Sequence, residues 1–131
     1  MTRWLLAHSA AAMMPSVARL PGAKDGGHLD EVVSAVLRES SWLMWLGLVG
    51  AAVGFMLSPV TTVGWPLPSW LLPKSVLDRH AAAFSAHPLY PLRQSATLIK
   101  LAASFAMARD PRVREALALG PDLPDPVDWR R

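Results

Sequence analysis

The sequence predicts an all-α protein, a small bundle of about five or six short helices in which one helix is apolar on every side and is a candidate for embedding in a membrane. Apolar residues recur at helical spacing in several segments, and proline and glycine separate these segments. Charged residues make up only 18% of the 131 residues. A chain of this length folds as one domain, to which we assign residues 1–120.

The N-terminal part of the chain predicts two helices. The first begins at a cap formed by Thr2 and ends just before Pro15, because proline lacks the amide that would continue the helix. The second begins at His28 or Asp30 and ends near Glu39, and its acidic residues face away from its apolar side. Its expected apolar positions are Val32, Val33, Val36 and Leu37.

Residues 42–73 form an apolar segment without a charged side chain. Its first half, Trp42 to Leu57, predicts a third helix that is capped by Ser41 and has no polar face. Sixteen residues at about 1.5 Å each give roughly 24 Å, less than the roughly 30 Å of a hydrocarbon core. Two interpretations therefore stay open: the helix spans a locally thinned bilayer, or it is buried in protein.

Small and aromatic residues mark candidate contact sites in this segment. Gly47, Gly50 and Gly54 are candidates for helix packing, because small residues let a neighbouring helix approach closely, in a membrane or in a soluble core. Tryptophan suits boundaries that are half wet, such as a membrane interface or a subunit contact. Four tryptophans bracket the segment and are the predicted membrane or partner interface: Trp42, Trp45, Trp65 and Trp70.

The C-terminal half predicts a helix that is apolar on most of its circumference. This fifth helix runs from Pro91 to Ala108 and has one narrow polar stripe, which contains Lys100. Each of its two apolar flanks must be buried against another surface. The other helices of this small chain can cover about one flank, so we expect a partner to cover the second. The predicted docking residues on that flank are Leu98, Leu101 and Phe105.

Helix signals also flank this fifth helix. A fourth helix is expected to begin at Ser75 and to end before Pro88. Asp110 followed by Pro111 predicts the start of a sixth helix, which we expect to run to residues 118–119 before a Gly120 cap. The tail, residues 121–131, is rich in proline and predicts an extended segment.

Composition and motifs argue against several functional classes. The chain has no cysteine, and its basic residues form no cluster of the kind that binds nucleic acid. No motif for a nucleophile, a phosphate loop or a zinc site is present, so we nominate no catalytic, cofactor-binding or metal residue. His80 and His87 lie seven residues apart without further ligands, and we expect surface or capping roles for them.

Several short motifs together resemble a known family, the small helical subunit or fused N-terminal region that accompanies flavin-dependent dehydrogenases of the glucose-methanol-choline class, including gluconate dehydrogenase subunit 3. The family pattern has charged residues where this chain is apolar, in residues 42–73. The resemblance implies a subunit that helps a flavoprotein to mature, to be exported or to be anchored. The motifs are Ala11–Pro15, Pro21–Ala23, Tyr90–Arg93 with Lys100, Asp110–Val113 and Ala116–Leu117.

We therefore expect a non-catalytic accessory subunit that docks, matures or membrane-anchors a larger oxidoreductase, with the flavin and the substrate chemistry in that partner. We expect it to be associated with the cell membrane. The alternative is a small single-span membrane subunit of a respiratory or photosynthetic complex, in which Gly50 and Gly54 form the packing face.

Overall fold

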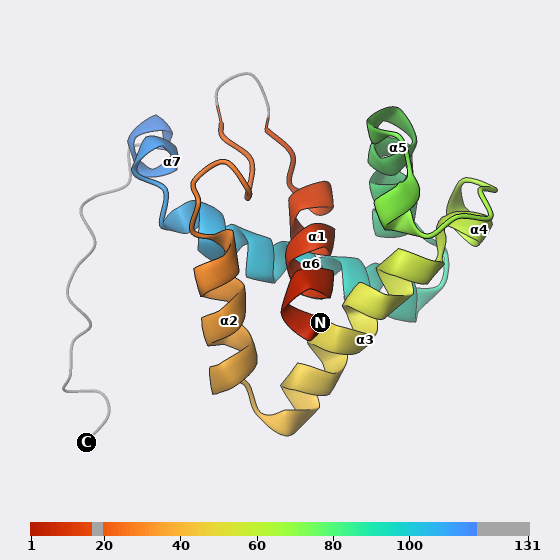
Figure 1. Cartoon of the computed structure of the whole chain (residues 1–131), viewed down its shortest axis with the longest axis horizontal. Coiled ribbons are helices and arrows are strands. Elements are labelled where there is room, and N and C mark those ends of the chain that lie inside the picture. Colours follow the sequence, from red (N-terminus) through yellow and green to blue (C-terminus); the bar gives the residue numbers. More distant parts are fainter. Residues whose placement is uncertain (17–19, 118–131) are drawn as a thin grey trace.

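The computed structural model describes residues 1–16 and 20–117. Every element within these ranges is helical, which confirms the predicted all-α class. Figure 1 shows α6 crossing the molecule behind α1, while α2 and α3 meet at the bottom of the view and diverge upward. The elements are α1 Thr2–Met13, α2 Leu29–Glu39, α3 Trp42–Leu57, α4 Pro59–Thr62, the 3-10 helix η1 Ser69–Leu71, α5 Lys74–Ser85, α6 Tyr90–Ala108 and α7 Pro111–Ala116.

Helix α6 is the centre of the packing. It contacts α1, α2, α3 and α5, and α7 follows at its C-terminal end. The side of α6 that faces these helices is built mainly from alanine, whose short side chain lets four neighbours approach. One of the two apolar flanks expected from the sequence is therefore buried inside the chain, through Ala96, Ile99, Ala102, Ala103 and Ala106.

Helix α3 has the bounds that its sequence predicts. The hydroxyl oxygen of Ser41 accepts a hydrogen bond from the amide of Met44 at 3.3 Å, which confirms the predicted N-cap. Only one side of the helix is buried, through residues such as Leu48 and Phe55. No helix in the described ranges combines the length and the apolar character needed to cross a membrane, so the expectation of a spanning helix is not confirmed.

A buried histidine completes the C-terminal end of α3. The carbonyl of Phe55 lacks the usual donor four residues on, because Pro59 has no amide hydrogen. His80 of α5 takes that place, with Nε2 at 2.9 Å from the carbonyl oxygen and Nδ1 at 2.6 Å from Thr62 Oγ1. Burial lowers the pKa of His80, against the opposing effect of the bond to the Phe55 carbonyl. The neutral ring therefore donates through Nε2, and its Nδ1 shares the single hydroxyl proton of Thr62 with the Ser58 carbonyl, which lies 2.9 Å from Thr62 Oγ1.

Two expected caps are wrong. α1 already includes Thr2 and α5 already includes Ser75, and neither helix has a side-chain cap. Pro73 precedes α5 and its fixed φ suits the residue that leads into a helix, so Ser75 falls inside the first turn. The Asp110 cap is confirmed, because its Oδ1 accepts the Arg112 amide at 2.9 Å.

The proline-rich connection adds two short elements, α4 and η1, to the helices that the sequence predicts. With α4, the described residues contain seven α-helices instead of about five or six. Helix α7 ends at Ala116 with Leu117 as its C-cap, two or three residues before the predicted end of the last helix. Position 120, the predicted cap, and the tail 121–131 lie outside the described residues.

Candidate interaction surface

The outer side of α3 is an uninterrupted apolar surface. Trp42 is 76% exposed and Leu57 is 65% exposed, and Leu46 and Val53 between them are also exposed. Their spacing of four, seven and four residues places all four on one side of a helix. The exposed apolar side chains continue into α4 and η1. We call this set the apolar face: Trp42, Leu43, Trp45, Leu46, Val53, Leu57, Val60, Trp65, Leu67, Trp70 and Leu71.

Element η1 is fastened to α3 by a buried side chain. Ser69 is fully buried, and its hydroxyl donates to Met56 Sδ at 3.0 Å. This contact holds η1 beside the end of α3 and creates an apolar groove of about 220 Å³. The groove is lined by Leu57, Val60, Trp65, Pro66, Leu67, Pro68 and Trp70.

The four tryptophans predicted as an interface are all at least partly exposed. Trp42 and Trp45 belong to the first turn of α3, and Trp65 and Trp70 line the groove beyond its last turn. The sequence could not select Leu46, Val53 and Leu57, because a helix without polar residues gives no sign of which side is buried.

A second exposed apolar patch lies on α6. Leu101 is 43% exposed and Phe105 is 51% exposed. Leu98, in contrast, is partly buried, and its Cδ1 would lie 3.7 Å from a Cβ placed at Gly47 of α3. Because Leu98, Leu101 and Phe105 follow at helical spacing, they form one line along the edge of α6 that meets α3. We call Leu101 and Phe105 the α6 patch.

The glycines of α3 differ in their surroundings. Gly47 faces Leu98, as described above. At Gly50 and Gly54, an added Cβ would meet no atom of another element within 4 Å in the described part of the chain. The space beside them is open, so their role in packing against a partner helix stays a prediction.

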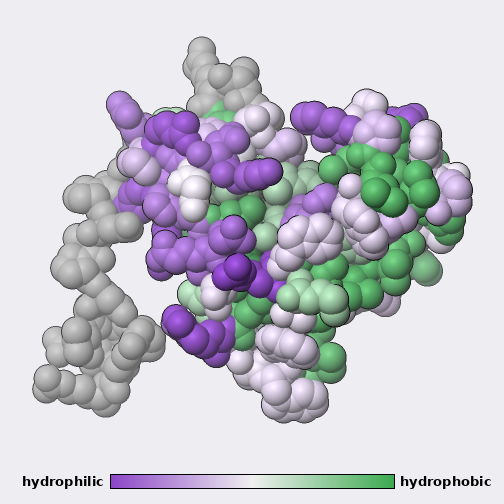
Figure 2. All heavy atoms as spheres, viewed as in Figure 1, coloured by the Kyte–Doolittle hydropathy of each residue, from purple (hydrophilic) through white to green (hydrophobic). Residues whose placement is uncertain are grey.

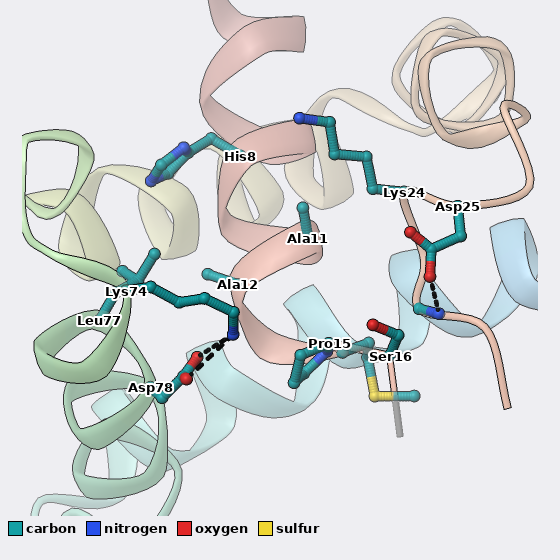
Figure 3. A pocket seen from close by; sticks show the side chains of 12 residues that line it. His8, Ala11, Ala12, Pro15, Ser16, Lys24, Asp25, Lys74, Leu77 and Asp78 are labelled. Atoms are coloured by element: carbon teal, nitrogen blue, oxygen red, sulfur yellow. Dashed lines mark hydrogen bonds and ion pairs between the residues drawn. The ribbon is translucent and has the colours of Figure 1, made fainter. Parts of the chain in front are cut away.

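Figure 3 shows a cleft between α1, the loop that contains Lys24 and Asp25, and α5. Its volume is about 340 Å³. His8 lies at the cleft wall, and its Nε2 is buried without a hydrogen-bond partner among the described residues. Burial, and then the charge of Lys24, lower the pKa of His8. On the opposite wall, Lys74 Nζ lies 3.1 Å from Asp78 Oδ2.

The charged groups of this cleft are balanced. Lys24 and Lys74 face two aspartates, and Asp25 already accepts the Gly22 amide at 2.7 Å. With His8 neutral, the cleft has no net formal charge and favours neither an anion nor a cation. The described ranges contain no group of three or more histidine, aspartate or glutamate residues arranged to hold a metal ion.

Charge is distributed unevenly between the two ends of the fold. Helices α5 and α6 together carry four lysines and arginines and one aspartate, whereas α2 carries three acidic residues and one arginine. Figure 2 shows hydrophobic residues gathered on the right, where α3 and α4 lie, and hydrophilic residues on the left, around α2. The elements of the apolar face contact the basic helices α5 and α6, and the C-terminal end of α2, with Arg38 and Glu39, lies just before its first residue, Trp42.

Comparison of the chain with protein-family models, with curated proteins and with solved structures finds no match. The resemblance to the small subunits of flavin-dependent dehydrogenases therefore stays a prediction.

Proposed function

We propose that this chain is a non-catalytic accessory subunit that docks on a larger protein through the α6 patch. The observation that carries the proposal is the exposure of Leu101 and Phe105 on a helix whose opposite flank forms the centre of the core. An exposed aromatic ring beside an exposed leucine is the kind of anchor that fills a pocket in a partner.

The α6 patch is held in place by its neighbour on the same helix. Leu98 is partly buried, and its contact with Gly47 of α3 fixes the edge of α6 that carries Leu101 and Phe105.

The proposed class of partner is a flavin-dependent dehydrogenase of the glucose-methanol-choline class, on the basis of the sequence resemblance. Two of the motifs of that resemblance are in contact, because the Ala23 amide donates to the Met14 carbonyl at 3.0 Å. Arg112 of a third motif donates through Nη2 to the carbonyl of Asp25, two residues after Ala23, at 3.1 Å. In this proposal the flavin and the substrate bind to the partner, and this chain assists its maturation or its attachment.

The test is co-expression of the full chain with dehydrogenases of that class from the same source, followed by co-purification. We expect Phe105→Asp to reduce the amount of bound dehydrogenase at least about tenfold, because it places a carboxylate in the centre of a desolvated contact. The matched control is Ala82→Asp, which places the same carboxylate at an exposed position of α5.

Both substituted side chains are exposed, so both variants should keep the circular dichroism spectrum of the parent protein. Leu98→Asp is unsuitable, because Leu98 packs between α3 and α6 and its loss would damage the fold. If no dehydrogenase of this class co-purifies, or if the two variants retain it equally, the proposal is wrong.

A further inference from the structure

We propose that the apolar face rests on the surface of a lipid bilayer that contains anionic lipid, with α3 parallel to the membrane plane. This proposal concerns the surface formed by α3, α4 and η1 and does not depend on what the α6 patch binds.

The orientation follows from the way α3 is buried. One long side of the helix, through Leu48, Ala52 and Phe55, is locked into the core against α1 and α6. The opposite side is exposed along its whole length, from Trp42 to Leu57. A helix held in this way can meet a bilayer only with its long side, as interfacial helices do.

The exposed polar groups favour lipid over protein as the occupant. Protein interfaces carry about one hydrogen bond per 100–200 Å², which requires donors and acceptors on both sides. Between residues 41 and 73 the exposed polar side chains, apart from tryptophan, are Ser41 and Thr61. Both already bond to the backbone of their own helix, Ser41 to the Met44 amide and Thr61 to the Ser58 carbonyl. Apart from the tryptophan N–H groups, the apolar face therefore has no exposed side-chain donor or acceptor left to bond with a polar partner surface.

The tryptophans suit the boundary between hydrocarbon and headgroups. Trp42 stands at one end of the apolar face, and Trp65 and Trp70 stand at the other. An indole ring buries its apolar body at such a boundary while its N–H reaches water or a headgroup. The groove between α3 and η1 is lined by leucine, valine, proline and tryptophan residues and has about 220 Å³ of space, which suits part of an acyl chain.

The basic residues beside the apolar face favour anionic lipid over neutral lipid. The apolar face itself has no charged residue, and it is bordered by α5 and α6, which together carry four basic residues and one acidic residue. That acidic residue, Asp78, is paired with Lys74 at 3.1 Å. Glu39 of α2 lies three residues before Trp42, where α2 meets α3, and its Oε1 is 3.9 Å from Arg38 Nη2, so these two charges offset each other at that end of the apolar face.

The test is flotation of the full chain with vesicles of phosphatidylcholine alone and with vesicles that also contain phosphatidylglycerol. We expect binding to the anionic vesicles, and weaker binding to the neutral ones by about fivefold for each basic residue that reaches the headgroups. Leu57→Glu should weaken binding at least about tenfold, since it replaces an inserted apolar group by a charge. The matched control, Leu117→Glu, changes an exposed leucine at the C-cap of α7 and should bind as the parent does.

Tryptophan emission supplies a second measurement. Lipids brominated on the acyl chain should quench the fluorescence of the parent protein, and Trp65→Phe with Trp70→Phe should remove much of that quenching. Absence of binding to anionic vesicles would overturn the proposal, and so would equal binding by Leu57→Glu and Leu117→Glu. A dimer in solution that Leu57→Glu dissociates would also overturn it, because a second copy would then cover the apolar face.

Discussion

The contact between Thr62 and His80 allows a quantitative test of how the end of α3 is held. Thr62→Val keeps the shape of the side chain and removes the hydroxyl that lies 2.6 Å from His80 Nδ1. His80 is fully buried, so its Nδ1 would lose the Thr62 hydroxyl without gaining water. Leaving a buried polar atom unsatisfied costs about 1–3 kcal/mol, and we expect the free energy of unfolding to fall by that amount.

Urea unfolding followed by circular dichroism measures this loss. With a slope of about 1–3 kcal/mol per molar urea for a small protein, the midpoint should fall by roughly 1 M. The control is Thr61→Val, one residue earlier: its hydroxyl also bonds to the Ser58 carbonyl, at 2.9 Å, but it is exposed and does not contact His80. The control should change stability by less than about 0.5 kcal/mol. Equal losses in the two variants would refute the assigned role of His80.

Two further predictions concern pH and the glycines. Burial lowers the folded-state pKa of His80 and of His8, so below about pH 6.5 the unfolded chain binds more protons than the folded chain. The free energy of unfolding should therefore be greatest above about pH 6.5 and decrease as the pH falls below it. Urea unfolding at a series of pH values checks this, and a flat profile would contradict it. Gly50→Ala should raise stability by roughly 0.5–1 kcal/mol, because the new Cβ sits in open space on a helix. Gly22→Ala should lower stability, because its Cβ would lie 2.6 Å from the Ser16 amide nitrogen; thermal unfolding should separate the two, and stabilisation by both would show that the loop at Gly22 has room.

Local signals predicted much of the helical framework. The bounds of α3 and the caps at Ser41 and Asp110 follow from the sequence, because a cap and a proline act on the residues beside them. The failures at Thr2 and Ser75 have the same origin, since a hydroxyl near a helix start is only one of several ways to begin a helix.

Contacts between distant residues could not be predicted. The sequence shows that Pro59 deprives Phe55 of a hydrogen-bond donor, but it does not show that His80 supplies one from 25 positions away. Likewise, nothing local indicates that Ala51 is buried while Gly50 is exposed, because both belong to a helix that is apolar on every side. The exposed side of α3 is determined by where α1 and α6 pack, which is a property of the whole fold.

Photocrosslinking at position 105 tests the proposed docking most directly. A photoreactive amino acid in place of Phe105 in the full chain, irradiated in cells of the source organism, labels whatever covers the α6 patch. We predict a covalent adduct with a flavin-dependent dehydrogenase at position 105, and no such adduct when the same group replaces the exposed Ala82 of α5. Adducts formed only with a second copy of this chain, or equal labelling of the dehydrogenase from both positions, would contradict it.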